Sequence, residues 1–577
     1  MSTLEKTGTL KSKHKLLRVS GSEAVILSLL EEKVDTIFGY PGGAIMPIYD
    51  ALYNFMDRIN HILVRHEQGA AHAAQGYARV SGKVGVCFAT SGPGATNLIT
   101  GVADANIDST PIVCITGQVP SHLLGTDAFQ ETDVLGISMP VTKWNFQVTR
   151  PEEIPDAISK AFYIARTGRP GPVLLDITKD AQFGTFDFKY EKCEKIRSYH
   201  PYPTPRENQI EEAAELINNA NKPYILAGHG VLISNAEKEL LNLAEKADIP
   251  VAQTLLGLSC FPPDHRNYVG YLGMHGNYGP NIKTNECDLL IAIGMRFDDR
   301  VTGDVKQYAR QAKVIHIEID PSEINKNIIA DIGINADAKS TLEKLIPLIK
   351  KNDHSEWIEE FKQCDRIEYE KVIKNQIHGD TPKIKMAEVI HILSNITNGE
   401  ATIITDVGQH QMIASRYYRF RKPNQHVTSG GLGTMGFALP SSMGAALGTN
   451  KQDVIAIIGD GGFQMTLQEL GTIAQYKIPV KIIVLNNHFL GMVRQWQQLF
   501  FEKRYSFTEM TNPDFVKIAE GFGINSRRTT ERTSLEDDIR RMLNTEGPYL
   551  MEVEVEKEDN VFPMVPSGDS VTNIRLE

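Results

Sequence analysis

The sequence predicts an α/β fold built from three doubly wound parallel sheets. The same local pattern occurs three times: an apolar β-branched run, a glycine-rich turn, an amphipathic segment, and a second apolar run introduced by proline. The copies occupy residues 84–117, 222–255 and 454–487. Continuous apolar strands are typical of parallel sheets with both faces covered, and the amphipathic segment supplies the helical crossover that parallel neighbours need. Because the copies are far apart in the chain, each predicts a sheet of its own.

The length and the connecting segments agree with three domains. The chain has 577 residues, which is too long for a single hydrophobic core. Residues 183–206 are polar and carry three prolines, and residues 354–382 are charged, so both are predicted as linkers. We therefore expect a flexible tail at residues 1–17 and domains at residues 18–190, 205–375 and 376–577.

Composition excludes several classes of protein. The formal net charge is -11 without a basic stripe, which argues against nucleic-acid binding. No apolar run reaches the roughly 18 residues of a membrane span, and the N-terminal lysines precede no apolar run of the secretory kind. The six cysteines are scattered without a CxxC pair, which favours reduced thiols and a cytoplasmic location.

The strongest chemical signal is a GDGG turn at residues 459–462, followed by two asparagines at the end of the next predicted strand. Glycines at the start of a helix let backbone N–H groups approach a phosphate. Mg²⁺ prefers oxygen ligands and often shares phosphates with one or two protein groups. Asp460 offers a carboxylate and Asn487 an amide oxygen. A tight turn without a ligand is the alternative, but the turn, helix and strand ending in two asparagines favour a diphosphate and metal site.

Glu67 lies at the end of another predicted strand, HILVRH, and is followed by the small residues of a predicted helix. The GDGG turn with its two asparagines resembles the metal-binding motif of the thiamine-diphosphate enzymes. In such enzymes thiamine needs a proton on its pyrimidine ring before its thiazolium carbon can lose one. A carboxylate in an apolar pocket suits that exchange of protons. A solvated carboxylate at a helix start is the alternative for an isolated residue, but the metal loop favours the catalytic interpretation.

Long motifs resemble the biosynthetic acetohydroxyacid synthases, which are FAD-bearing thiamine-diphosphate enzymes. The resemblance runs from about residue 18 to the C-terminus. It implies a central FAD-binding domain and the condensation of a hydroxyethyl unit from pyruvate with pyruvate or 2-ketobutyrate. The products would be 2-acetolactate or 2-aceto-2-hydroxybutyrate, the first common step of branched-chain amino acid biosynthesis. The motifs are GYPGGA, RHEQGAAHAAQGYAR, TSGPGATN, TDAFQE, GRPGPVLLDITKD, MRFDDRVTG, GGLGTMGFALP and GMVRQWQ.

The resemblance implies a set of residues for thiamine diphosphate and Mg²⁺. The metal would be held by Asp460, Asn487 and the backbone carbonyl of Phe489. The catalytic residues would be Glu67, Gly43, Gln130 and Lys179. The cofactor-binding residues would be Tyr40, Pro41, Gly42, Glu67, Thr90, Val407, Gly408, Gln409, His410, Gly433, Met435, Gly459, Asp460, Gly461, Gly462, Asn487, Phe489, Gly491 and Met492.

The stretch RFDDR at residues 296–300 follows an apolar strand and so lies at a ligand-binding edge. Arginines there can hold phosphate, although a surface ion-pair cluster is the alternative. By resemblance it belongs to a FAD site in which the flavin has no redox role. That site would comprise Arg169, Gly228, Gly230, Thr254, Leu255, Leu272, Gly273, Met274, His275, Gly294, Arg296, Asp298, Arg300, Val301, Asp320, Asp337 and Ala338. The substrate channel would be lined by Phe129, Met274, Arg300 and Trp496.

The resemblance also implies partners. We expect a homodimer or a dimer of dimers with the active site between subunits, and a separate small regulatory subunit for any feedback by amino acids. Pyruvate oxidase is the alternative within the thiamine class. A NAD-dependent dehydrogenase would need a GxGxxG turn, which GHG and GDGG do not supply. A non-catalytic binding protein would have no use for Glu67, Asp460 and Asn487.

Overall fold

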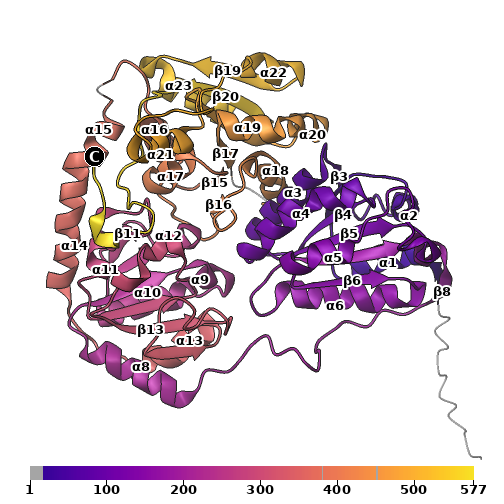
Figure 1. Cartoon of the computed structure of the whole chain (residues 1–577), viewed down its shortest axis with the longest axis horizontal. Coiled ribbons are helices and arrows are strands. Elements are labelled where there is room, and N and C mark those ends of the chain that lie inside the picture. Colours follow the sequence, from indigo (N-terminus) through magenta and orange to yellow (C-terminus); the bar gives the residue numbers. More distant parts are fainter. Residues whose placement is uncertain (1–16, 380, 450–452) are drawn as a thin grey trace, which may run out of the picture.

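A computed structural model describes residues 17–379, 381–449 and 453–577 (Figure 1). It contains three six-stranded parallel sheets and a two-stranded antiparallel ribbon, so the predicted fold class is confirmed. The ribbon pairs β1 (Leu17–Ser20) with β8 (Thr185–Phe188). The tail expected at residues 1–17 otherwise lies outside the described residues.

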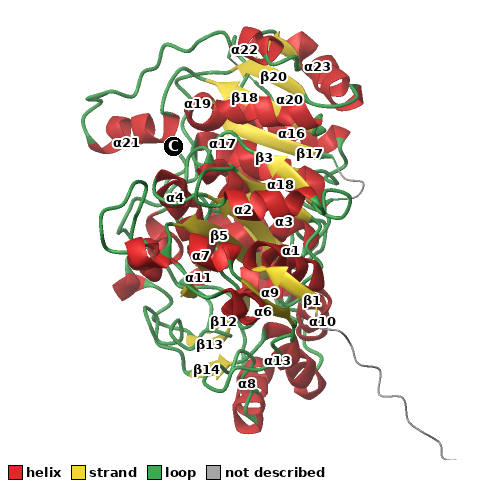
Figure 2. Cartoon of the chain, turned by 90° about the vertical axis from the view of Figure 1, so that its right-hand side faces the viewer, coloured by secondary structure: helices red, strands yellow, loops and turns green. Residues whose placement is uncertain are grey.

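The N-terminal domain is a sheet in the order β3-β2-β4-β5-β7-β6, with helices on both faces (Figure 2). The first repeated pattern forms β4, α4 and β5, as predicted, and β4 pairs with β5 in parallel. The strands are β2 (Thr36–Gly39), β3 (Asn60–Leu63), β4 (Gly85–Ala89), β5 (Ile112–Gln118), β6 (Trp144–Val148) and β7 (Val173–Thr178). The helices are α1 (Gly21–Glu31), α2 (Met46–Tyr53), α3 (Glu67–Ser81), α4 (Pro93–Ile107), α5 (Val134–Ser138), α6 (Ile154–Arg166) and α7 (Lys179–Phe183).

The central domain has a different topology, in the order β11-β10-β9-β12-β13-β14. Numbered along the chain, this is 3-2-1-4-5-6, the order of dinucleotide-binding sheets, whose ligands sit where the order reverses. That reversal lies between β9 and β12. The strands are β9 (Pro223–Ala227), β10 (Val251–Gln253), β11 (Tyr268–Tyr271), β12 (Leu289–Ile293), β13 (Lys313–Glu318) and β14 (Ile332–Asn335). The helices are α8 (Glu207–Asn219), α9 (His229–Ile233), α10 (Glu237–Ala247), α11 (Tyr278–Thr284), α12 (Asp299–Thr302) and α13 (Ala338–Leu345).

The C-terminal domain repeats the topology of the N-terminal one. Its order is β16-β15-β17-β18-β20-β19, so both sheets read 2-1-3-4-6-5 when their strands are numbered along the chain. The strands are β15 (Thr402–Thr405), β16 (His426–Thr428), β17 (Val454–Gly459), β18 (Val480–Asn486), β19 (Asn525–Thr529) and β20 (Tyr549–Glu554). The helices are α16 (Met386–Ile396), α17 (Gln409–Tyr417), α18 (Ala438–Gly448), α19 (Asp460–Thr466), α20 (Leu470–Tyr476), α21 (Gly491–Phe500), α22 (Phe515–Gly521) and α23 (Arg532–Asn544).

The two like domains pack through equivalent helices, α3 and α18, each of which follows the second strand of its sheet (Figure 1). Their backbones approach closely because glycines face the partner helix. A Cβ on Gly76 would lie 1.9 Å from the carbonyl oxygen of Ser441, and one on Gly444 would lie 1.7 Å from that of Ala73. One hydrophobic core therefore runs through both domains.

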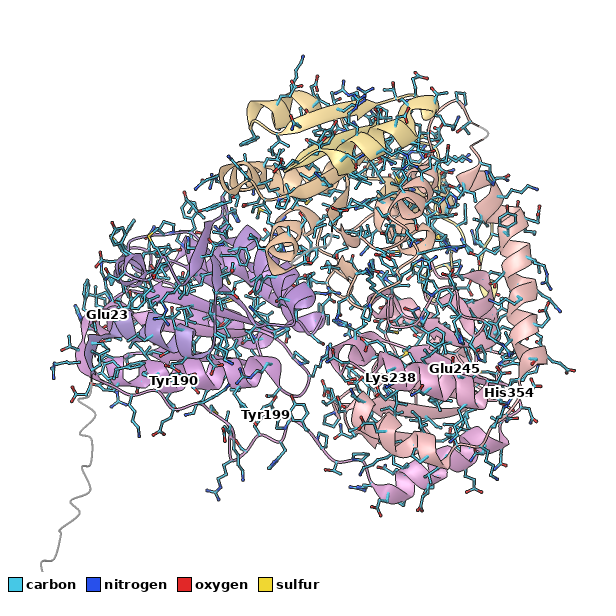
Figure 3. All side chains as sticks on the ribbon, turned by 180° about the vertical axis from the view of Figure 1, so that it is seen from behind. Glu23, Tyr190, Tyr199, Lys238, Glu245 and His354 are labelled. Carbon is cyan, nitrogen blue, oxygen red and sulfur yellow. The ribbon has the colours of Figure 1, made fainter. Side chains whose placement is uncertain are left out.

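The two predicted linkers have more structure than expected. Residues 355–377 are almost wholly helical, with α14 (Ser355–Glu368) and α15 (Lys374–Ile377) joined by a π-helical turn. Trp357, Phe361 and Cys364 form a buried stripe on α14, which the high charge of the segment concealed. The first connection includes β8, and its Tyr190 and Tyr199 lie along the N-terminal domain (Figure 3). The Tyr199 hydroxyl donates to the carbonyl of Thr167 at 2.7 Å.

The described residues include no helix that is both long and apolar enough to cross a membrane. All six cysteines are free, and five of them are buried. This agrees with the expected reduced thiols.

Candidate functional site

The predicted metal loop is formed at the carboxyl ends of β17 and β18. Asp460 begins α19 and is buried, and its Oδ2 accepts a hydrogen bond of 2.7 Å from Nδ2 of Asn512. Burial raises the pKa of Asp460 to about 6, and the bond from Asn512 opposes that rise. Asn512 also donates to Oδ1 of Asn486 at 2.9 Å, so it connects the two strand ends. It lies in a loop without a recognisable motif, which is why sequence reasoning missed it.

Hydrogen bonds at both polar atoms of its amide fix the side chain of Asn487. Nδ2 donates to Oε1 of Gln409 at 3.3 Å, and Oδ1 accepts from the backbone N–H of Phe489 at 3.1 Å. This places one carboxylate, one amide oxygen and one backbone carbonyl at the same edge of the sheet. The described residues contain no cluster of three or more acidic, His or Cys ligands. A set this sparse fits Mg²⁺ that takes its remaining oxygens from phosphate and water.

The segment predicted to contact the diphosphate runs from the end of β15 into α17, beside the metal loop. The imidazole of His410 lies against two glycine turns, since a Cβ on Gly408 or on Gly459 would lie 2.9 Å from its Nδ1. Met435 reaches the same place, with its Cε 3.4 Å from the position of a Cβ on Gly461. The turns after β15, β16 and β17 therefore surround one space, and side chains at these glycines would fill it.

The N-terminal domain brings a second group of predicted residues together at the carboxyl ends of its strands. Glu67 is buried at the start of α3, and its Oε2 accepts from Nδ2 of Asn97 at 3.0 Å. A Cβ on Gly94 would lie 2.8 Å from the Cγ2 of Thr90 and 3.3 Å from Oε1 of Glu67. Gln130 lies beside Gly92, where a Cβ would meet its carbonyl oxygen at 2.8 Å.

Several predicted residues of this edge are open to solvent in the single chain. Phe129 is 88% exposed and Tyr40 is 41% exposed. Pro41 and Gly43 are exposed, while Gly42 and Lys179, the latter at the start of α7, are half-buried. A face that carries a buried carboxylate and an exposed phenylalanine is incomplete as a pocket.

The chain does not bring its two groups into contact. Among the described residues, no hydrogen bond or ion pair joins Glu67 to Asp460 or Asn487. The turn before Glu67 meets a different residue of the C-terminal domain, the buried Glu469, whose Oε1 accepts from the backbone N–H of Arg65 at 3.0 Å and of His66 at 3.1 Å. Burial raises the pKa of Glu469 to about 7. Sequence reasoning did not single out this residue.

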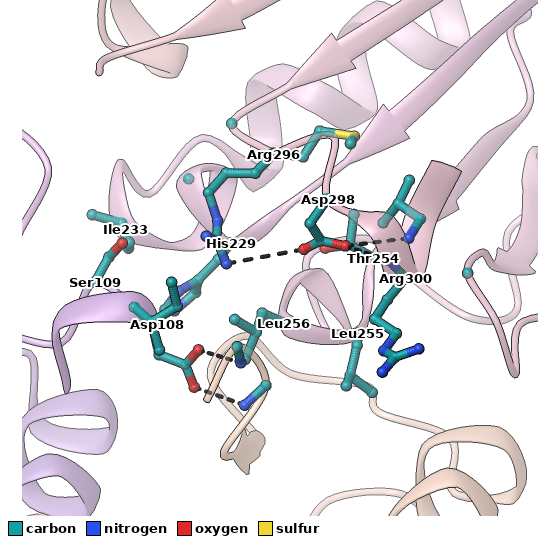
Figure 4. Close-up of a pocket in the computed structure, with 18 of the residues that line it drawn as sticks. Asp108, Ser109, His229, Ile233, Thr254, Leu255, Leu256, Arg296, Asp298 and Arg300 are labelled. Atoms are coloured by element: carbon teal, nitrogen blue, oxygen red, sulfur yellow. Dashed lines mark hydrogen bonds and ion pairs between the residues drawn. The ribbon is translucent and has the colours of Figure 1, made fainter. Parts of the chain in front are cut away.

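A cavity of about 720 Å³ lies between the three domains (Figure 4). Every residue predicted for the flavin lines it except Gly228 and Asp320. Gly228 lies just behind the wall. It packs closely against Gly294, since a Cβ on Gly228 would lie 2.3 Å from the carbonyl oxygen of Gly294. Asp320 instead forms an ion pair with Arg169 at 3.1 Å. The cavity begins at the reversal of strand order between β9 and β12, which fits a dinucleotide.

The cavity carries charge of both signs. Nη2 of Arg296 lies 4.0 Å from Oδ2 of Asp298. Oδ1 of Asp298 accepts hydrogen bonds from the backbone N–H groups of Arg300 and Val301 in the first turn of α12. Burial raises the pKa of Asp298, and Arg296 opposes that rise. The RFDDR stretch is therefore a cavity wall rather than a surface ion-pair cluster.

Asp104 of α4 and Asp108, the residue after α4, connect the cavity to the loop between β16 and α18, and neither was predicted. Asp108 accepts from the backbone N–H of Gly430 at 2.8 Å and of Gly431 at 2.7 Å (Figure 4). Asp104 accepts from the hydroxyl of Thr434 at 2.8 Å. Burial raises the pKa of Asp108 to about 6. These bonds hold the loop before α18, which contains Gly433 and Met435.

The opposite end of the cavity reaches the predicted substrate channel. Met274, Arg300 and Trp496 line it together with Val407, Gly408, Gly433 and Met492, whereas Phe129 does not. Trp496 lies on the second turn of α21 and packs on Phe500 with ring centroids 4.9 Å apart. The C-terminal segment contacts one residue of this wall. The backbone N–H of Val565 donates to the carbonyl of Met274 at 2.8 Å.

Comparison with known proteins agrees with this geometry. Thiamine pyrophosphate enzyme family models match the chain at residues 19–137 (N-terminal TPP binding domain), 210–345 (central domain) and 406–553 (C-terminal TPP binding domain). The chain is 47% identical to an acetolactate synthase large subunit of Corynebacterium glutamicum, over 97% of this chain and 90% of that one. It is 46% identical to a probable acetolactate synthase large subunit of Methanocaldococcus jannaschii, over 96% and 95%. It is 44% identical to the acetolactate synthase isozyme 2 large subunit of Escherichia coli, over 96% and 98%. The chain therefore belongs to the thiamine pyrophosphate enzymes, and among them to the family of acetolactate synthase large subunits.

Proposed function

We propose that this chain is the catalytic subunit of an acetolactate synthase. It would decarboxylate pyruvate and join the two-carbon unit to pyruvate or 2-ketobutyrate, giving 2-acetolactate or 2-aceto-2-hydroxybutyrate for branched-chain amino acid synthesis. The observation that carries the proposal is the continuous cavity from Arg296 to Gly408 and Trp496. It joins a dinucleotide-type sheet to the turns after β15 and β16, which are predicted to bind thiamine diphosphate. The names of the relatives supply the substrate class.

The residues fit the cofactors that this reaction needs. Thiamine diphosphate, when bound, supplies the electron sink that lets a 2-keto acid lose CO₂ and attack a second one. Asp460, Asn487 and the carbonyl of Phe489 would hold Mg²⁺. The cavity between Arg169 and Arg300 would hold FAD, which has no redox role in a reaction without net electron transfer.

The chain's own groups have separate tasks. Glu67 would exchange a proton with the pyrimidine ring from its buried position. The amide N–H groups at the start of α19 face the diphosphate charge. Trp496 and Met274 form apolar walls that orient the second 2-keto acid and exclude water.

The site is proposed to lie between two subunits of a homodimer, or of a dimer of dimers. The incomplete face around Glu67, Tyr40 and Phe129 would then cover the metal loop of a second copy. The names of the relatives as large subunits support a separate small regulatory subunit as a further partner. The six free cysteines support a reducing, cytoplasmic setting.

The test of activity is an acetolactate assay with pyruvate, thiamine diphosphate, Mg²⁺ and FAD, each omitted in turn. We expect product to require thiamine diphosphate and Mg²⁺, and a redox-inactive flavin analogue to replace FAD. Consumption of oxygen or reduction of a quinone in place of acetolactate would favour a pyruvate oxidase and contradict the proposal.

The test of the shared site uses two inactive variants, Glu67→Gln and Asp460→Ala, co-expressed with different tags. If each site takes Glu67 from one subunit and Asp460 from the other, a purified mixed dimer has one intact site of two and about half of the wild-type activity. If each site lies within one chain, both sites of the mixed dimer are damaged and it is inactive.

A further inference from the structure

We propose that Asp406 is a positioning residue that holds the His410 ring with its Nδ1 aimed at the diphosphate of the cofactor. The inference rests on the proposed function, since it concerns how this chain binds thiamine diphosphate. Asp406 follows the last residue of β15 and has no exposed surface.

Asp406 contacts all three turns that surround the diphosphate space. Its Oδ1 accepts from Nε2 of His410 at 2.5 Å, on the first turn of α17. Its Oδ2 accepts from the backbone N–H of Gly436 at 2.8 Å, next to Met435. A Cβ on Gly462 would lie 1.9 Å from Oδ2, so the turn of the metal loop packs directly on the carboxylate. One side chain therefore sets the spacing of the three turns.

The pairing also fixes the orientation of the imidazole. A buried carboxylate is costly unless it is paired and hydrogen-bonded. The side-chain partner of Asp406 among the described residues is His410, whose Nε2 lies 2.5 Å from Oδ1. The backbone N–H of Gly436 satisfies the other oxygen.

The second ring nitrogen is free to act on a ligand. Nδ1 has no hydrogen-bond partner among the described residues, and it faces the glycines at 408 and 459. A ring that carries a proton on Nδ1 would donate it in a hydrogen bond to a phosphate oxygen.

The experiment measures the dissociation constant of thiamine diphosphate at saturating Mg²⁺ by calorimetry on the assembled enzyme. The variants are Asp406→Ala, Asp406→Asn, His410→Gln and the double variant Asp406→Ala/His410→Gln. We expect Asp406→Ala to weaken binding by roughly 10- to 100-fold, the usual cost of removing a residue that orients a ligand-binding histidine. Asp406→Asn should lose less, because its amide can donate to Nε2 and leave Nδ1–H on a neutral ring. The double variant should lose clearly less affinity than the two single losses combined, since Asp406 acts largely through the ring.

A matched control is Asp538→Ala, which removes another buried aspartate of the same domain, paired with Arg527 away from the cofactor turns. Its dissociation constant should equal that of the wild type. Equal binding by Asp406→Ala and the wild type would overturn the inference, and so would additive losses in the double variant. A wild-type enzyme that bound no thiamine diphosphate would instead refute the proposed function. If Asp406→Ala fails to fold, as judged by thermal unfolding, Asp406→Asn against His410→Gln decides the question.

Discussion

The N-terminal and C-terminal domains have the same strand order but different chemistry at equivalent strand ends. After the third strand of each sheet, the N-terminal domain has the neutral turn Ser91-Gly92-Pro93, whereas the C-terminal domain has Asp460 between glycines. After the second strand, Glu67 begins helix α3 directly, whereas a glycine-rich loop precedes α18. The topology is therefore the same in both domains, and a few residues at the strand ends give these ends different chemistry. Under the proposed function, the N-terminal domain exchanges a proton and the C-terminal domain binds the diphosphate and Mg²⁺.

The central domain extends this comparison. Its order, 3-2-1-4-5-6, places the reversal between β9 and β12, and the cavity opens at that point. The outer domains share a core through α3 and α18. Under the proposed function, Glu67 of one domain and the metal loop of the other serve one reaction, and the proposed assembly of two chains would bring them together.

The largest effect on turnover is expected for Glu67, the proposed acid–base residue of the N-terminal domain. Glu67→Gln should lower turnover by roughly 10²–10⁴-fold, the usual contribution of acid–base catalysis. Binding of thiamine diphosphate should persist, because the metal loop lies in the other domain. Turnover and cofactor affinity of the purified variant decide this. Near-normal turnover would show that Glu67 takes no part in the mechanism. Loss of thiamine diphosphate binding would show that the N-terminal domain also contributes to cofactor affinity.

A smaller effect is expected for Asn512, which acts on the metal ligand of the C-terminal domain. Asn512→Ala removes the amide that orients Asp460 and joins it to Asn486. The apparent Mg²⁺ affinity should fall by roughly 10- to 100-fold, as is usual when a residue behind a metal ligand is removed. The measurement is cofactor binding against Mg²⁺ concentration. Asn395→Ala, which removes an amide bonded to His391 on the outer helix α16, is the control, and an equal effect there would reject a specific role.

The repeated strand, turn and helix pattern predicted the fold because it depends on local hydrophobic order alone. Residues in motifs, such as Asp460 and Asn487, could be named before the structure. Asn512, Glu469 and Asp104 could not, because they follow no strand-end motif and their partners lie up to hundreds of residues away. The helical structure of residues 355–377 was not predicted, because charged residues around Trp357 and Phe361 mask the buried stripe that these two form.

Trp496 tests whether the C-terminal domain also sets the choice of acceptor. Its indole lines the cavity beside Met274, so it can contact the extra methylene of 2-ketobutyrate. One methylene in an apolar pocket is worth about 1–3 kcal/mol. Trp496→Leu should therefore lower the preference for 2-ketobutyrate by roughly tenfold or more, while acetolactate formation continues.

The measurement is a competition assay with both acceptors present. Trp144→Leu is the control, because Trp144 stacks on Phe146 of the N-terminal domain and does not line the cavity. An unchanged product ratio in Trp496→Leu would make its indole an ordinary packing residue.

The smallest effect is expected for Glu469, at the contact between the N-terminal and C-terminal domains. The quantity that should change is the free energy of unfolding. Glu469 of the C-terminal domain accepts from the backbone of Arg65 and His66, and its Oε2 accepts from the Thr472 hydroxyl at 2.7 Å. Burial raises the pKa of Glu469 from 4.5 to about 7 in the folded chain. The folded state therefore holds a proton that the unfolded chain releases, so this contribution to stability is present below pH 4.5 and is lost as the pH rises through 7.

Glutamine imitates the protonated acid without titrating. Its Oε1 can accept from Arg65 and His66, and its Nε2 can donate to Thr472, whose hydroxyl also reaches the carbonyl of Leu63 at 3.2 Å. Between the two pKa values the wild type should lose about 1.4 kcal/mol of stability per pH unit relative to Glu469→Gln. Thermal unfolding at several pH values from 5 to 8 measures this. The difference in stability between Glu469→Gln and the wild type should widen from pH 5 to about pH 7 and then level off. Glu368→Gln gives the contrast, because it breaks a buried pair with Arg416 and should destabilise the chain at every pH. A gap for Glu469→Gln that stayed constant across this range would mean that Glu469 remains ionised where the two domains meet, and that its bonds to the turn before Glu67 are those of a carboxylate.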